Sequence, residues 1–191
     1  MREYFHDRKP LNDSLHNYML QQFKIYLLVG GMPDAINKFI ENRNIAQVRK
    51  IQRDIHALYK LDASQYDDEK KLVIRKIYDM IPSNMENKKK RVVAQRIEGK
   101  KGSTFANYED EFEYLISAGI ALNVQAISTP TFPLIESSGK NLLKLYLNDV
   151  GILTSILYGS NIRAILEDER SINLGSVYES VVASELIAHG Y

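Results

Sequence analysis

The chain has 191 residues, of which 45% are hydrophobic and 26% charged, and its formal net charge is +1. This length and composition fit one large globular domain or two small ones. So small a net charge excludes a positive electrostatic field over the whole protein that would attract nucleic acid or an anionic membrane. The absence of cysteine excludes disulfides, thiolate metal sites and cysteine nucleophiles. No apolar run reaches about 18 residues and the start has no signal-like apolar segment, so we expect no membrane span and a cytoplasmic location.

The first part of the chain predicts two helices with a sharp break between them. Apolar residues recur at helical spacing from Leu15 to Leu27. Gly30 and Gly31 are expected to end that helix, because glycine adopts left-handed backbone conformations without a steric cost. Pro33 suits the first turn of the next helix, since the N–H that proline lacks would be unpaired there.

Two amphipathic helices are predicted next. The apolar stripe of the first consists of Val48, Ile51, Ile55, Leu58 and Tyr59. Arg49, Lys50 and Arg53 lie mainly off this stripe. The second helix has acidic residues at 67–69, which favour its positive N-terminal end, and Pro82 is expected to mark its C-terminal end.

The middle of the chain predicts a winged helix-turn-helix. After the helix that ends near Pro82 come a basic segment at 88–101 and a compact helix at 107–119. Two strands follow at 120–127 and 141–147, separated by a loop that contains proline and serine. A three-helix core with a two-stranded wing has this order of elements. The predicted fold class is therefore mainly α with a small β component.

The basic segment is a candidate for binding nucleic acid. Its basic residues are Lys88, Lys89, Lys90, Arg91, Arg96, Lys100 and Lys101, against the single acidic residue Glu98. These side chains can bind phosphates, although a solvated turn is the commoner fate of a lysine run. The helix at 107–119 has an acidic outer face, with Glu109, Asp110, Glu111 and Glu113, which opposes its insertion in a major groove.

The C-terminal part predicts two further helices. The first is short, with Asn148 or Asp149 as its cap and Gly159 as its stop. The second, at 174–191, has an apolar arc with Glu185 near the centre. A buried carboxylate costs free energy unless it is paired, so Glu185 is expected to form a salt bridge or lie at a wet helix end, or else to face a metal site.

No complete catalytic motif is present. "GKKGST" at 99–104 lacks the G-x-x-x-x-G-K-[ST] spacing of a phosphate-binding loop. The histidines are scattered and form no H-x-x-x-H pair; they are His6, His16, His56 and His189. His56 lies beside the apolar stripe of its helix, where a packing role is the better interpretation.

Three stretches together resemble a known family: "YLLVGGMPDAI" (26–36), "LYLNDVGIL" (145–153) and "LGSVYESVVASEL" (174–186). Their order and spacing are similar to the C-terminal half of bacterial and archaeal AAA+-type ATPases that carry a C-terminal domain of unknown function. The resemblance extends from about residue 15 onward. It implies a parent protein with a P-loop ATPase module that uses ATP and Mg²⁺, a helical lid, a winged-helix-like domain and a PD-(D/E)XK nuclease-like domain.

The resemblance also implies a division of this chain. Residues 1–45 would be a helical lid remnant and linker, 46–147 the winged-helix-like domain, and 148–191 a helical connector with the first helix of a truncated nuclease-like domain. Glu179 matches the family's metal-site glutamate in that helix. The aspartate and the Glu-x-Lys that should follow are not in the sequence, so this metal site would be incomplete.

We therefore expect a fragment with no catalytic and no cofactor-binding residues, which connects the ATPase and nuclease-like domains of its parent. Its expected partners are the rest of the parent chain, with DNA and a second copy bound through the C-terminal helix as further candidates, and no membrane. One alternative is a free-standing winged-helix DNA-binding regulator, which the basic segment favours and the acidic helix opposes. Another is a protein-interaction module that uses the apolar edge of the last helix, including Val181 and Val182.

Overall fold

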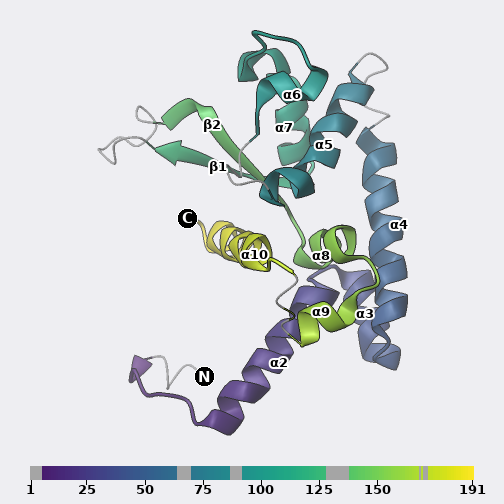
Figure 1. Ribbon diagram of the computed structural model, residues 1–191, viewed down its shortest axis with the longest axis vertical. Helices are drawn as coiled ribbons and strands as arrows, with labels where there is room; N and C mark the ends of the chain where they lie inside the picture. The colour runs from purple at the N-terminus through teal and green to yellow at the C-terminus, as the bar shows by residue number, and fades with distance from the viewer. Residues whose placement is uncertain (1–5, 64–69, 87–91, 128–137, 168, 170–171) are drawn as a thin grey trace.

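The computed structural model describes residues 6–63, 70–86, 92–127, 138–167, 169 and 172–191 (Figure 1). The chain is mainly helical with one small antiparallel sheet, which confirms the predicted fold class. Its helices are α2 (Asp13–Val29), α3 (Pro33–Asn42), α4 (Ile45–Ala63), α5 (Lys71–Glu86), α6 (Ala94–Glu98), the 3-10 helix η1 (Phe105–Tyr108), α7 (Glu109–Ser117), α8 (Val150–Tyr158), α9 (Ile162–Leu166) and α10 (Gly175–Ala188). The strands are β1 (Ala121–Ile127) and β2 (Ser138–Leu147).

The break between α2 and α3 forms as the sequence predicts. Gly30 ends α2 with a positive φ of 74°, and its backbone N–H donates to the carbonyl of Tyr26. Pro33 occupies the first turn of α3. The chain therefore turns sharply at Gly30, whose backbone conformation would strain any residue with a side chain.

Three details of the helices differ from the sequence predictions. Pro82 lies inside α5, which continues to Glu86, because Pro82 and its neighbours are buried in the core and that packing outweighs the lost backbone bond. Arg49 was expected off the apolar stripe of α4 but is buried, whereas Leu58 on that stripe is exposed. The short helix α9 was not predicted. The acidic residues at 67–69 lie outside the described residues.

The order from α5 to β2 contains the expected helix α5, helix α7 and two strands, and it adds α6 and η1, which were not predicted, within and after the basic segment. Strands β1 and β2 pair in an antiparallel ribbon, with Leu122 opposite Tyr146 and Val124 opposite Lys144. The pairing is irregular between Gln125 and Ile127. Figure 1 shows the ribbon projecting from the body of the protein, with α10 beneath it and α5, α6 and α7 on its other side.

One apolar cluster runs through the molecule. It contains buried side chains from most elements, including Leu27 of α2, Ile77 of α5, Leu115 of α7, Leu153 of α8 and Val177 of α10. The segments expected to be lid, winged helix and connector therefore share a continuous core. Burial of this surface is the main stabilising contribution to the fold.

Candidate functional site

A buried cluster of polar groups lies where α2 ends, α4 passes and α8 begins (Figure 1). We call it the polar junction, and it consists of the backbone at Gly30 and Gly31, the side chains of Arg49, Gln52, Asp149 and Thr154, and the backbone at Gly151. These residues come from three separate stretches of the sequence. Buried polar groups need partners, so each contact in the cluster fixes one of these stretches against another.

Asp149 joins the α2–α3 break to α8. Its carboxylate is only 6% exposed; Oδ1 accepts from the backbone amide of Ile152 at 2.8 Å, which caps α8. The other oxygen, Oδ2, accepts from the amide of Gly31 at 2.6 Å. Burial raises the pKa of Asp149, and hydrogen bonds from the amides of Gly31 and Ile152 oppose that rise. Asp149 is thus both a helix cap and a long-range tie.

Glycine is required on both sides of this tie. A Cβ added to Gly30 would overlap with the carboxylate of Asp149. A Cβ added to Gly151 would overlap with the amide of Gln52 and lie 2.7 Å from the carbonyl oxygen of Val29. The two backbones therefore approach as closely as they do because neither position has a side chain.

Gln52 and Thr154 complete the end of α2. The carbonyl groups of its last turn lack helical partners, as at any helix end. The Gln52 amide donates to the carbonyl oxygens of Leu28 at 2.8 Å and Val29 at 2.9 Å. The Thr154 hydroxyl donates to the carbonyl oxygen of Leu27 at 2.7 Å. Side chains from α4 and α8 thus replace the missing next turn of α2.

Arg49 is the charged group at the centre of the junction, and it is 2% exposed. Its Nη1 lies within hydrogen-bonding distance of the Gln52 side-chain oxygen at 2.8 Å and the Gly151 carbonyl at 3.0 Å. In contrast, the described residues offer no hydrogen-bond partner to Nε or Nη2. Burial lowers the pKa of Arg49 to about 10, nearby Arg53 adds to the decrease and Asp149 opposes it. The sequence missed this residue because arginine is rarely buried.

Glu179, the predicted metal-site residue, is bound to β2. Its Oε1 accepts from Lys144 Nζ at 2.6 Å and from the Tyr146 hydroxyl at 2.7 Å. Burial and the hydrogen bond to Glu179 raise the pKa of Tyr146. Among the described residues, no three or more histidine, cysteine, aspartate or glutamate side chains gather as metal ligands. Within the described residues Glu179 is held by Lys144 and Tyr146, and its metal role stays a prediction.

The last helix buries a different face from the one expected. Val177 and Val181 pack into the core, together with the small residues Ser180 and Ala183. Glu185, predicted near the centre of the apolar arc, is exposed and lies 4.0 Å from His189. The small side chains allow α10 to approach the ribbon and α8 closely, which places Glu185 on the outside. The apolar residues Tyr178, Val182, Leu186 and Ile187 are left exposed.

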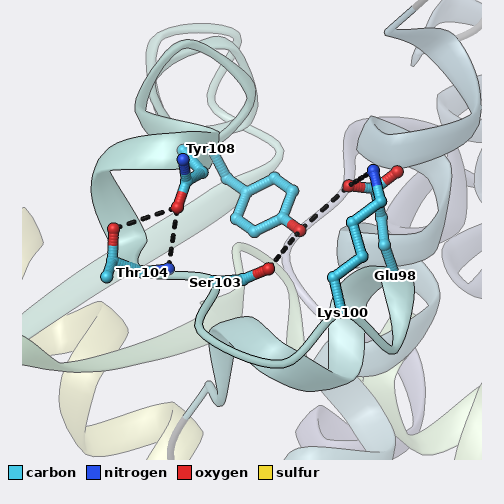
Figure 2. A network of polar contacts seen from close by, with 6 residues as sticks. Glu98, Lys100, Ser103, Thr104 and Tyr108 are labelled. Carbon is cyan, nitrogen blue, oxygen red and sulfur yellow. Dashed lines mark hydrogen bonds and ion pairs between the residues drawn. The ribbon is translucent and has the colours of Figure 1, made fainter.

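The basic segment is only partly described, since Lys88, Lys89, Lys90 and Arg91 lie outside the described residues. Arg96 and Lys101 are exposed. Lys100 is paired with Glu98 at 3.2 Å, and the same carboxylate accepts from the Tyr108 hydroxyl at 3.0 Å (Figure 2). These hydrogen bonds from Tyr108 and Lys100 lower the pKa of Glu98. Part of the expected positive charge is therefore neutralised within the turn.

Helix α7, which would follow that turn into a groove, is acidic outside. Glu109, Asp110 and Glu113 are exposed. Asp110 forms an ion pair with Lys70, which lies just before α5. Glu111 was expected on the same face but is buried. The exposed carboxylates would repel phosphates, which opposes insertion of α7 in a major groove, as the sequence also indicated.

His56 has the packing role that its position predicted. Its Nδ1 lies 2.6 Å from the hydroxyl of buried Tyr78, and the two rings are 5.2 Å apart. Burial lowers the pKa of His56, with a further contribution from Lys60, and Asp79 opposes the shift. Histidine is thus part of the α4–α5 contact.

Residues 20–163 match a family described as a domain of unknown function, DUF8612. The match covers about three quarters of the chain. The chain belongs to the DUF8612 family. No curated protein and no solved structure matches it. The DUF8612 match contains every residue of the polar junction, whereas α10 and Glu179 lie outside it.

Most of the polar junction in this DUF8612 protein is buried, although Gly31 is exposed, and the carboxylate of Asp149 is held by backbone amides. None of the described helices has the length and apolar character needed to span a membrane.

Proposed function

We propose that this chain is a non-catalytic connecting and interaction region of an AAA+-type ATPase, linking its ATPase module to a nuclease-like C-terminal domain. The resemblance of residues 26–36, 145–153 and 174–186 to that family supports the proposal. Two of these stretches meet in the structure at one contact, between the amide of Gly31 and the carboxylate of Asp149 at 2.6 Å. That contact is the observation that carries the proposal.

A connecting region must transmit movement without absorbing it. Pulling α2 away from α8 would take the Gly31 amide from the Asp149 carboxylate and the Thr154 hydroxyl from the Leu27 carbonyl, and each lost bond costs about 1–3 kcal/mol. Further along, Glu179 ties α10 to β2 through Lys144 and Tyr146. Movement of the α2–α3 segment would therefore carry α8, and the ribbon would carry α10.

DNA binding as a free-standing winged-helix regulator is the second candidate. The exposed side chains of Arg96 and Lys101 at the α6 turn favour it. The acidic outer face of α7 opposes it. In a gel-shift assay, sequence-specific binding that is lost in Lys101→Glu would support the regulator, and equal weak binding to all sequences would not.

Two measurements test the connecting function. The purified chain should hydrolyse no ATP and cleave no DNA with Mg²⁺, and turnover in either assay would contradict a non-catalytic role. The genomic reading frame should contain a P-loop motif upstream and an aspartate followed by Glu-x-Lys downstream. A frame closed by stop codons on both sides, with neither motif nearby, would contradict the AAA+-type parent.

A further inference from the structure

Within the part of the chain that the structure describes, no strand pairs with the outer edge of β1. The amide of Asn148 donates to the carbonyl of Ile120 at 3.3 Å, which makes that pair a hydrogen-bonded one. Because bonded and non-bonded pairs alternate in an antiparallel ladder, the backbone groups of Leu122 and Val124 also point toward β2. The backbone groups of Asn123 and Gln125 therefore point outward.

The same alternation is visible on β2. The carbonyl of Leu143 points away from β1 and accepts from the amide of Val92 at 3.0 Å. The outer edge of β2 is thus partly covered. No comparable bond reaches Asn123 or Gln125 from the part of the chain that the structure describes, and both residues are exposed.

This edge lacks the features that normally protect an open strand. The stretch 121–127, "ALNVQAI", has no charged residue and no proline. Native proteins usually protect such edges with lysine, proline or a bulge, and here the irregularity begins only after Gln125. Val124 on the same stretch is 37% exposed. An uncharged open edge of this kind is built to pair with another strand.

We propose that β1 pairs with β1 of a second copy of this chain, antiparallel and with Val124 opposite Val124 on the two-fold axis. In this register Asn123 of one copy lies opposite Gln125 of the other. The outward amides and carbonyls of Asn123 and Gln125 then satisfy each other on both sides of the axis. No like charges face one another, because the strand has none. The two-stranded ribbons of the two copies together form one four-stranded sheet.

Self-pairing fits better than pairing with a foreign strand. The outward backbone groups of the exposed stretch can pair with their own copies about a two-fold axis, and the stretch has no charge that would select a charged partner. The inference is independent of the proposed function. It differs from association through α10, whose exposed face is on another element.

A cross-linking experiment tests the register directly. The chain has no cysteine, so Val124→Cys provides a single thiol on the axis. Opposed residues of a non-bonded antiparallel pair lie about 4.5 Å apart at Cα, which is within disulfide range. Mild oxidation should convert Val124→Cys to a covalent dimer, whereas Val182→Cys, on the exposed face of α10, should stay monomeric. Fast dimer formation by Val182→Cys alone would overturn the proposal.

Sedimentation of the full chain over a series of concentrations measures self-association and tests whether it depends on the outer edge of β1. Asn123→Pro removes only an outward N–H, so it should weaken self-association about tenfold or more while Asn123→Ala keeps it. Circular dichroism and thermal unfolding of each variant show whether the monomer stays folded. A wild-type chain that is monomeric at every concentration, or equal association of Asn123→Pro and Asn123→Ala, would overturn the proposal.

Discussion

The carboxylate of Asp149 accepts a 2.6 Å hydrogen bond from the backbone amide of Gly31, which lies 118 residues earlier in the chain. The same side chain caps α8 through the amide of Ile152. One buried carboxylate therefore fixes the break between two N-terminal helices to the start of a helix that follows the ribbon. The predictions below test this junction from its different sides.

Asp149→Asn should lower the free energy of unfolding by about 1–3 kcal/mol. An amide offers one acceptor oxygen instead of two, so either Gly31 or Ile152 loses its partner inside the protein. Urea unfolding of both proteins measures the difference. Asp54→Asn, at an exposed position of α4, is the control and should change stability by less than about 0.5 kcal/mol. Equal effects of the two substitutions would show that the carboxylate is not a tie.

Gly30→Ala should destabilise the protein more than Gly119→Ala. Both glycines have a positive φ, 74° and 67°, so each substitution strains the backbone, and Gly30 combines its positive φ with a ψ of −162°, a region that essentially only glycine adopts. Only at Gly30 would the new methyl group also overlap with Asp149, since Gly119 has no heavy atom within 4 Å of an added Cβ. Thermal unfolding should show a larger decrease in Tm for Gly30→Ala. A similar decrease would mean that the junction relaxes easily.

Arg49→Met should lower the free energy of unfolding by less than Gln52→Leu does, because removal of the buried charge offsets part of the cost of its lost hydrogen bonds. The carbonyl of Leu28 keeps its bond from Gln52, whereas the Gln52 side-chain oxygen and the Gly151 carbonyl lose the bonds from Nη1. The variant also removes a buried charge with two unpaired nitrogens. Denaturant unfolding at neutral pH provides the measurement.

Gln52→Leu is the matched change one turn along α4, and it should cost about 1–3 kcal/mol. It removes the only side-chain donor to the carbonyl of Val29 that the described residues contain. If Arg49→Met proves the more damaging of the pair, the hydrogen bonds of Arg49 Nη1 outweigh the cost of burying its charge.

The stability of the chain should fall as the pH drops below 6.5, and His56 should account for part of the decrease. The pKa of His56 is lowered in the folded protein from its ordinary value of 6.5. The unfolded chain therefore binds the proton first, and stability is lost from pH 6.5 down to the folded pKa, below which no more is lost.

Urea unfolding at neutral and mildly acidic pH should show a smaller pH effect in His56→Gln than in the wild type. Tyr78→Phe should keep most of the effect, since burial is the largest cause of the shift. An unchanged pH dependence in His56→Gln would place the titrating group elsewhere.

Glycine, proline and helix-capping residues made much of the fold predictable from sequence. Gly30, Pro33 and Gly159 have the helix-ending or helix-starting roles that glycine and proline usually have, and Asp149 caps α8 as expected. Local rules also misplaced one feature, because Pro82 continues a helix that core packing holds together. Such packing depends on residues distant in sequence.

The polar junction could not be predicted in the same way. Periodicity assigns Arg49 to the surface, and the polar side chain of Gln52 gave no signal of its burial. Both side chains can be buried only because the facing carbonyls of α2 and the backbone of Gly151 provide partners. The buried face of α10 was misassigned for a related reason. Ser180 and Ala183 are small, and such residues become buried only where a neighbouring element approaches the helix closely. Pairing across more than a hundred residues leaves no local pattern in either stretch.

Native-state hydrogen exchange at the amides of Gly31 and Ile152 tests the central claim most directly. Both amides donate to the Asp149 carboxylate, so a rigid connection predicts that they exchange only through global unfolding, with the same opening free energy as core amides such as that of Ile77. In Asp149→Asn at least one of the two should exchange through a local opening. Fast exchange of Gly31 and Ile152 in the wild-type chain, while Ile77 stays protected, would show that the junction opens on its own and would contradict the connecting function.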